Sequence, residues 1–494
     1  MAQQPITLNV SQPNQNWPNI VTYHIFVRSF SDGNGDGIGD LKGITARWEY
    51  LRKLGAEAIL ISPVFASPSY HKYDVTDYYK LSPEYGNIES FQYFIKDAHA
   101  EGFKVILDIP LNHCSSKDSW FLEAAKNPAS TMRNYFVWSN NPPATEKDKW
   151  YLPKDEKGNT IGKTYYYGFF SPEMPDWNYD NAQVVEESQR ILKFWIDLGV
   201  DGFRLDAAQH IFKDHNKNIG FWNMISAYIK SINKHAFLVG EVDNSSDVVA
   251  PYLKPLDACF DFDLSREIVQ SLKNENASNF PVRMEKIITH YSVANKDYRD
   301  VIFLTNHDQN RLMSEVGNNL DKAKLAANIL FTLPGIPYIY YGEEIGMKGE
   351  KPDEFIREPM LFAPEKEDEM RPNWMKPKYS TDKTVEPAIV QIKEDQSLWN
   401  HYSRLISLRK DNRALYFGQF ENSSLSSKSI IAYYRIYNQM RVLIINNVSA
   451  TAVTLTKEEK DNSLVNSIYQ TSKQTIVKGN KITLAPYSTI ILTN

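Results

Sequence analysis

A closed parallel barrel of eight β-strands with intervening helices is the fold that this sequence predicts, together with an inserted segment and a C-terminal β-domain. Three observations predict it. About eight short apolar runs alternate with amphipathic stretches, a Trp-, Tyr-, Pro- and Asn-rich segment interrupts them once, and short alternating strands begin near residue 418. Continuous apolar strands indicate a sheet covered on both faces, and eight of them favour a (β/α)8 TIM barrel over an open sheet.

The barrel elements follow from the spacing of apolar residues. Short continuous apolar runs predict the strands at 21–28, 57–62, 103–109, 201–206, 237–241, 258–263, 301–306 and 337–342. Apolar residues at helical spacing predict helices at 41–55, 88–102 and 182–199. The charged, Pro-containing segment 347–383 is expected to be a long loop at the rim of the barrel.

These elements divide the chain into four parts. We expect a polar, unstructured lead-in at 1–19, a barrel at 20–113 and 179–415, an inserted domain at 114–178, and a β-sandwich at 416–494. The inserted domain shows no clear βα unit, whereas the last part reads as short antiparallel strands.

Composition excludes several classes of protein. With 42% hydrophobic and 23% charged residues among 494, the chain is neither disordered nor fibrous. The balance of 55 basic and 60 acidic residues gives a net charge of −5, which argues against nucleic acid or an anionic membrane as partner. No apolar run is long enough to span a membrane. Two cysteines cannot form a disulfide framework, and nothing places Cys114 near Cys259.

Polar residues follow the predicted strands at their C-terminal ends, where a barrel of this type holds its reacting groups. Any single one is more readily explained as a satisfied buried polar group. Four strand ends meeting at one rim favour a functional site, because burying several carboxylates together is costly. The strand ends are DIPLNH (108–113), FRLD (203–206), GE (240–241) and NHD (306–308).

Three carboxylates, Asp206, Glu241 and Asp308, would face one another across this rim. An ionised and a protonated carboxyl group on either side of a scissile bond are the equipment for glycoside hydrolysis. Arg204 lies two residues before Asp206, so both side chains point to the same face of the strand and the cation can keep the carboxylate ionised. A like charge nearby can raise the pKa of the second carboxyl group.

These residues resemble the signatures of the α-amylase family of retaining glycoside hydrolases over nearly the whole chain, from about residue 20. Six stretches match in the right order. They are DIPLNH (108–113), MPDWN (174–178), DGFRLDAAQH (201–210), LVGEV (238–242), FLTNHD (303–308) and GIPYIYYGEEIG (335–346).

The resemblance implies a role for each matching residue. Asp206 is the expected nucleophile, Glu241 the general acid and base, and Asp308 the third acid that grips sugar hydroxyls. The expected substrate-binding residues are His71, Tyr73, His113, Arg204, His210 and His307. The resemblance also implies retention of the α configuration, with the Asp206 and Glu241 carboxyl groups about 5–5.5 Å apart.

A calcium loop is predicted after the first strand, in the sequence DGNGDGIGD (32–40). Its spacing supplies oxygen ligands as in the opening of an EF-hand loop, although position 12 is Gly43 and no helix precedes it. Three carboxylates within nine residues would repel one another without a cation. The alternative is an ion-free turn, and Mg²⁺ is disfavoured. The expected ligands of this structural ion are Asp32, Asn34, Asp36, the Ile38 carbonyl and Asp40.

The mixture of motifs resembles an intermediary group between α-amylases, oligo-1,6-glucosidases and neopullulanases. Ala207 after the nucleophile favours α-1,4 bonds and hence an α-amylase (EC 3.2.1.1) acting on starch and maltodextrins. A neopullulanase, cyclomaltodextrinase, α-glucosidase or oligo-1,6-glucosidase remains the alternative. A metal-dependent hydrolase would need paired histidines where the first strand has only His24, and non-catalytic relatives typically lose the carboxylates.

The partner expected from this resemblance is an α-glucan or maltooligosaccharide, bound by a monomer without a membrane span. A starch-degrading enzyme would be exported, which favours a secreted or periplasmic protein whose signal is not in this sequence. A cytoplasmic maltodextrin enzyme would look the same, because Met1–Val10 has no basic region followed by an apolar one.

Overall fold

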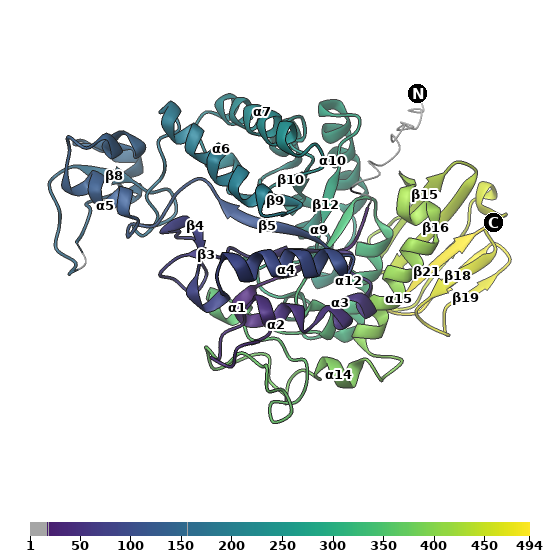
Figure 1. Cartoon of the computed structure of the whole chain (residues 1–494). Helices are drawn as coiled ribbons and strands as arrows, with labels where there is room; N and C mark the ends of the chain where they lie inside the picture. Colours follow the sequence, from purple (N-terminus) through teal and green to yellow (C-terminus); the bar gives the residue numbers. More distant parts are fainter. Residues whose placement is uncertain (1–16, 18, 156) are drawn as a thin grey trace.

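A computed structural model describes residues 17, 19–155 and 157–494 and shows a closed parallel barrel with β-rich parts on either side (Figure 1). All eight barrel strands occur where apolar runs predicted them, and β1 pairs with β13 to close the ring. In chain order the strands are β1 (Thr22–Ile25), β2 (Ala58–Ile61), β5 (Lys104–Pro110), β9 (Gly202–Asp206), β10 (Phe237–Gly240), β11 (Ala258–Phe260), β12 (Asp300–Ile302) and β13 (Ile336–Tyr340).

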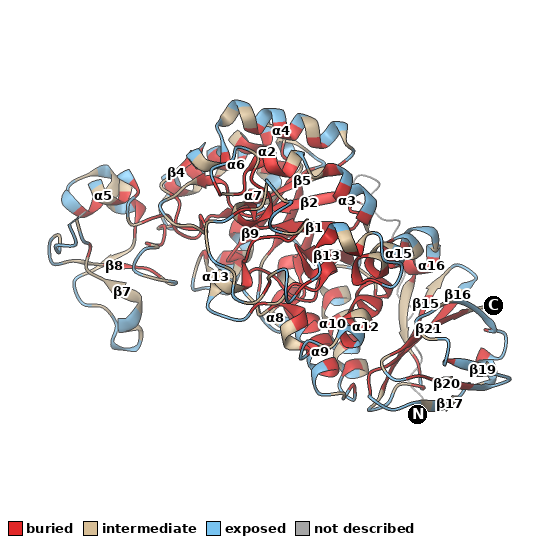
Figure 2. Ribbon diagram, turned by 90° about the horizontal axis from the view of Figure 1, so that it is seen from below, coloured by how far each residue is buried: buried red, intermediate tan, exposed pale blue. Residues whose placement is uncertain are grey.

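Helices cover the outside of the barrel and leave the strands buried on both faces (Figure 2). Helices α4 (Ile88–Ala100) and α6 (Ala182–Asp197) lie where periodicity predicted them. The helical segment predicted at 41–55 forms as two helices, α2 (Leu41–Thr45) and α3 (Trp48–Leu54). Between them Arg47 has φ of −111° and ψ of 11°, outside the helical region, and its guanidinium donates to Ser31 Oγ at 3.1 Å and to Asp368 Oδ1 at 3.0 Å.

The segment after β5 extends from one side of the barrel (left in Figure 1). It contains α5 (Ser119–Lys126) and a small antiparallel sheet in the order β6-β8-β7. The strands are β6 (Trp138–Ser139), β7 (Trp150–Tyr151) and β8 (Tyr165–Tyr167). Aromatic side chains make its core, as in the parallel stacking of Phe121 on Trp138.

The C-terminal β-domain lies on the opposite side of the barrel and consists of two antiparallel sheets (Figure 1). Leu443 and Ile445 of one sheet share a buried apolar cluster with Ile482 and Leu484 of the other, so the two sheets pack face to face. The larger sheet has the order β14 (Gln419–Asn422), β15 (Ile430–Tyr437), β16 (Met440–Asn447), β21 (Thr489–Thr493) and β18 (Asn466–Gln470). The smaller has β17 (Val453–Thr456), β20 (Lys481–Leu484) and β19 (Ile476–Lys478).

The end of the predicted lead-in is packed rather than unstructured. Trp17 is buried, stacks on Phe237 at 4.7 Å and donates to the His235 carbonyl at 2.7 Å. Asn19 donates to the Tyr416 carbonyl at 2.7 Å. The rest of the predicted lead-in, at 1–16 and 18, lies outside the described residues. The sequence did not predict the burial of Trp17, because a single tryptophan in a short polar stretch produces no periodic pattern.

Two further observations bear on the sequence predictions. Cys114 and Cys259 are both buried as free thiols. No helix among residues 17, 19–155 and 157–494 is long and apolar enough to cross a membrane.

Candidate active site

Four barrel strands, of which β5, β9 and β10 are neighbours, bring the predicted polar residues to one end of the barrel. Asp108 lies on β5, Arg204 and Asp206 lie on β9, and Glu241 follows β10 directly. Asp308 comes six residues after β12 ends. Because the strands are parallel, their carboxyl ends meet at the same rim.

Arg204 is the centre of the site. Its Nη1 donates to Asp206 Oδ1 at 2.7 Å and to both oxygens of Asp108, at 2.7 and 2.8 Å. Its Nη2 lies 2.6 Å from Glu241 Oε1. The guanidinium is only 2% exposed, so these charges interact with little screening. One buried cation therefore holds three carboxyl groups from three strands.

A second guanidinium, that of Arg357, holds the third acid. Arg357 Nη2 donates to Asp308 Oδ1 at 2.8 Å, and its Nε donates to the His307 carbonyl at 2.8 Å. His307 Nε2 lies 3.0 Å from Asp308 Oδ2 and 2.6 Å from the Tyr73 hydroxyl. The Tyr73 and His307 rings stack nearly parallel, with an interplanar angle of 5°. The two rings and the carboxylate therefore form one rigid wall.

The backbone turns sharply after β9. Ala207 has φ of 50°, a left-handed conformation that non-glycine residues rarely adopt. Its N–H donates to Glu241 Oε2 at 3.0 Å, so this turn fixes the carboxyl group that follows β10. Strained residues of this kind cluster at functional sites, because the surrounding structure must hold them.

The inserted segment closes one side of the site. Asp176, from MPDWN, accepts from the Phe169 N–H at 2.9 Å, and His113 pairs with Asp176 through the backbone. This places the Phe169 ring on His210, at 4.1 Å, and the half-exposed Phe170 ring 5.3 Å from His113. The segment therefore places aromatic rings against two of the predicted substrate-binding histidines.

A pocket of about 480 Å³ opens between these groups. Seven of the nine predicted catalytic and substrate-binding residues line it, and Arg204 and His307 lie buried beneath it. The seven are His71, Tyr73, His113, Asp206, His210, Glu241 and Asp308.

The long loop after β13 supplies residues that the sequence did not single out. Lys351, Asp353 and Arg357 line the pocket, and Asp353 accepts from Arg357 Nη2 at 3.0 Å. Phe170 of the inserted segment also lines it. The high charge of the rim loop was the only sequence feature that pointed to these residues. Composition does not say which of the charged side chains points into the pocket.

The environment pushes the pKa values of the acids apart. Burial raises the pKa of Asp206 and that of Glu241 to about 7 each, against the opposing effect of Arg204. Burial would also raise the pKa of Asp308, but His307, Arg357 and Arg204 together hold it well below its ordinary value. At neutral pH the site thus contains an ionised Asp308 and a pair, Asp206 and Glu241, that shares protons.

We expect a narrow, bell-shaped pH dependence of kcat/KM with its maximum near neutrality. Below about pH 6 both members of the Asp206–Glu241 pair are protonated and the pair supplies no ionised nucleophile, whereas above about pH 8 both are ionised and the pair supplies no acid. Initial rates on a soluble maltooligosaccharide across pH 4–10 measure this. A flat profile between pH 5 and 9 would contradict the pairing.

The predicted calcium loop is ordered by its own carboxylates. Asp32 accepts from the N–H groups of Asn34, Gly35 and Gly37, and Asp40 caps α2 by accepting from Gly43 N. Among residues 17, 19–155 and 157–494, no three His, Cys, Asp or Glu side chains converge as a metal site. The loop concentrates hard oxygen donors and negative charge, which is the chemistry that suits calcium.

Comparison with known proteins agrees with this geometry. Residues 24–418 match the family model described as alpha amylase, catalytic domain, and residues 430–491 match the Alpha-amylase SusG C-terminal domain. The chain is 40% identical to Alpha-amylase 3 of Dictyoglomus thermophilum over 97% of this chain and 94% of that protein. It is 36% identical to a 4-alpha-glucanotransferase of Thermotoga neapolitana over 87% of this chain and 96% of that protein.

The crystal structure of an alpha-amylase from H. orenii superimposes with a TM-score of 0.86 at 37% identity, covering 96% of this chain and 99% of that one. The barrel and the C-terminal β-domain agree with these matches. The chain belongs to the α-amylase family of glycoside hydrolases.

Proposed function

We propose that this protein is an α-amylase that hydrolyses α-1,4-glucosidic bonds in starch and maltodextrins with retention of configuration. One observation carries the proposal: Arg204 contacts both Asp206 and Glu241 at the edge of a pocket that Asp308 also lines. Two carboxyl groups sharing one buried cation and titrating near neutrality can supply a nucleophile and an acid together.

Asp206 is the nucleophile of the proposed reaction. Its free oxygen attacks the anomeric carbon, while protonated Glu241 gives its proton to the departing glycosidic oxygen. The resulting β-linked glycosyl ester on Asp206 keeps the sugar in the pocket. Ionised Glu241 then removes a proton from water, which attacks the same carbon, and the product leaves in the α configuration.

The surrounding residues stabilise the transition state of this reaction. The ring carbon becomes positively charged, and ionised Asp308, held by Arg357, lies in the same pocket. His113 and His307 have lowered pKa values because they are buried, so at neutral pH they act as uncharged hydrogen-bonding groups. Asp308, His113 and His307 are thus proposed to orient the sugar hydroxyls.

The alternatives differ in the acceptor and in the length of the substrate. Near the pocket, Asp243 pairs with Arg266 at 2.5 Å and Gln209 lies within 3.4 Å of the Asp243 carbonyl, so this edge is polar. A polar edge can hold an acceptor sugar, which favours transfer as well as hydrolysis. Hence a glucanotransferase is the second candidate, beside the oligosaccharide-cleaving enzymes expected from the motifs.

Products from soluble starch, pullulan, cyclodextrin and isomaltose over a short time course test the assignment. We expect starch to be shortened fastest, and NMR to show the α-anomer as the first-formed product. A β-anomer formed first would overturn the mechanism. Lengthening of maltotriose to longer chains without net release of reducing ends would assign the protein as a transferase instead.

We further propose that loop 32–40 binds a structural calcium ion. Asp32, Asn34, Asp36, the Ile38 carbonyl and Asp40 would hold it, and the ion would supply positive charge to the loop, away from the pocket. Burial and the neighbouring carboxylates Asp32 and Asp36 raise the pKa of Asp40, which shows the repulsion that a cation would relieve.

Removal of this ion is expected to lower thermal stability without removing the catalytic carboxylates. A ligand at a thousand times its Kd stabilises the native state by about 4 kcal/mol, so excess chelator should lower the Tm by a few degrees. Differential scanning calorimetry with and without chelator measures it, and Asp36→Asn is the matched variant with a smaller response. An unchanged Tm in excess chelator would remove the calcium proposal.

A further inference from the structure

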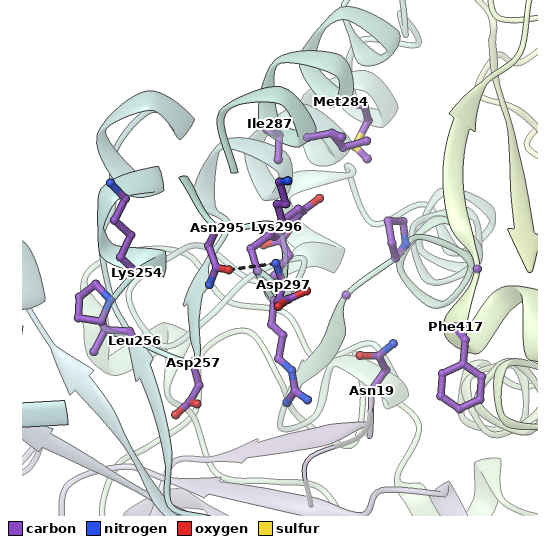
Figure 3. Close-up of a pocket in the computed structure, with 18 of the residues that line it drawn as sticks. Asn19, Lys254, Leu256, Asp257, Met284, Ile287, Asn295, Lys296, Asp297 and Phe417 are labelled. Atoms are coloured by element: carbon purple, nitrogen blue, oxygen red, sulfur yellow. Dashed lines mark hydrogen bonds between the residues drawn. The ribbon is translucent and has the colours of Figure 1, made fainter. Parts of the chain in front are cut away.

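A second pocket, of about 550 Å³, lies at the end of the barrel where the strands begin, opposite the carboxylates. Figure 3 shows the residues that line it. Its wall includes the residues that precede or begin four strands, namely Asn19, Asp257, Asp300 and Gly335. Helix α10 (Phe280–Ala294) and residues 417–418, at the junction with the C-terminal domain, complete it. Nothing in the proposed reaction uses this pocket.

Arg299 is the cation that this pocket leaves without a partner. Its Nη2 atom is buried and makes no hydrogen bond to any residue that the structure describes. Burial lowers the pKa of Arg299, yet a guanidinium stays charged at neutral pH. A buried N–H group without an acceptor costs free energy. Arg299 also lines the pocket and forms no ion pair with a described residue, so its guanidinium can take an anion from outside the chain.

The acidic residues of the pocket do not provide that acceptor. Asp257 Oδ2 is engaged by Lys230 Nζ at 2.6 Å and by the Leu238 N–H at 2.8 Å. Asp300 is buried beside Asp261, and burial together with that neighbour raises the pKa of Asp300 well above its ordinary value. Asp297 is the remaining acid of the wall, and it is exposed.

Positive charge is therefore in excess. Lys254 and Lys296 line the same pocket, and within the described part of the chain neither they nor Arg299 form an ion pair within 4.0 Å. Arg435 also lines it, but its guanidinium donates to the carbonyls of Thr332 and Gly418, at 2.6 and 2.8 Å for the shorter bonds. The wall thus carries four basic side chains, none with an ion pair to a described residue, against three acidic ones, so the pocket favours an anion.

Part of the remaining wall is apolar. Leu256, Met284, Ile287, Ile288 and Phe417 face the pocket, and Figure 3 shows Met284 and Ile287 on the helix above the polar residues. The pocket is also larger than a small inorganic ion needs, and within the range of organic ligand sites. Its occupant thus combines an anionic group with a bulkier, less charged body.

We propose that this pocket binds a small phosphate-bearing organic molecule whose phosphate group is held by Arg299. A phosphate monoester carries nearly two negative charges at neutral pH, which suits a wall of unpaired cations, and its oxygens accept paired hydrogen bonds from a guanidinium. The less charged body rests on the apolar wall below α10. Because the pocket joins the barrel to the C-terminal domain, its occupant stabilises that junction.

Isothermal titration calorimetry of the full chain tests the proposal with three probes: inorganic phosphate, a hexose phosphate and the unphosphorylated hexose. Chloride of equal ionic strength is the reference. We expect one site for both phosphates, tighter for the hexose phosphate, and none for the hexose at this position. Binding by inorganic phosphate alone would assign the site to the free ion and overturn the organic ligand.

Variants separate this pocket from phosphate bound elsewhere or to calcium. Arg299→Gln should weaken phosphate binding at least about tenfold. Arg299→Lys should recover part of the affinity, because lysine restores the positive charge but not the paired N–H donors of the guanidinium. The exposed Lys473→Gln is the matched control and should bind as the wild type does. Equal affinity in Arg299→Gln and wild type, or no saturable binding at all, would overturn the proposal. Unchanged maltooligosaccharide cleavage by Arg299→Gln shows that the variant is folded.

Discussion

Asp206→Asn is expected to lower kcat on a maltooligosaccharide by at least about 10⁴-fold while the protein stays folded. The amide keeps the shape of the side chain and can still contact Arg204, but it is a poor nucleophile and carries no charge to stabilise a positive ring carbon. Steady-state rates on a chromogenic maltooligosaccharide measure this loss. The KM should change far less, because Asp206 acts mainly after the substrate is bound.

Asp395→Asn is the matched control, since its side chain is 82% exposed and pairs with Arg404 at the surface. It should leave kcat within twofold. If Asp206→Asn kept more than a hundredth of the wild-type rate, a nucleophilic role for Asp206 would be excluded.

The partner variant Glu241→Gln separates the two carboxyl roles. It cannot protonate a sugar leaving group, so we expect a severe loss on natural oligosaccharides. A substrate with an activated leaving group needs no such proton, and there the first step should recover, with accumulation of the glycosyl ester on Asp206. Mass spectrometry of the quenched reaction detects that ester. Equal losses on both kinds of substrate would contradict the acid role of Glu241.

Removal of the central cation is the second large effect. We expect Arg204→Gln to lower kcat/KM by about 10³-fold and the free energy of unfolding by about 3–5 kcal/mol at pH 7–8, because three buried carboxyl groups lose their counter-charge. Urea unfolding at several pH values, followed by fluorescence, measures the stability.

The pH dependence identifies the cause of that destabilisation. Without Arg204, the pKa values of Asp108, Asp206 and Glu241 rise further above those of the unfolded chain. Such groups favour the native state below the unfolded pKa and lose that contribution as the pH rises through the folded pKa. The variant should therefore be closer to wild type at pH 5 than at pH 8. Arg204→Lys should recover part of the stability, and the exposed Arg404→Gln should change neither property. Equal destabilisation at pH 5 and pH 8 would contradict the electrostatic explanation.

Much of the fold could be predicted because barrel strands buried on both faces appear as continuous apolar runs. All eight were found, as were α4 and α6. The helical segment predicted at 41–55 is present but divided in two at Arg47, whose backbone leaves the helical conformation, and local periodicity does not register such a break. The burial of Trp17 was not predicted either, because it depends on a contact with Phe237, which is far away in the sequence.

The sequence by itself determined which strand ends carry the carboxylates and Arg204, because residues two apart on a strand share a face and parallel strands end at one rim. Only the tertiary structure decided that Arg204 holds three acids, that Arg357 of the rim loop holds Asp308, and that Arg299 faces a pocket without a partner. Each of these depends on distances and burial between segments far apart in the chain. The periodicity of a sequence predicts which face of its helix or strand a side chain occupies. It does not predict which side chain from another segment lies against it.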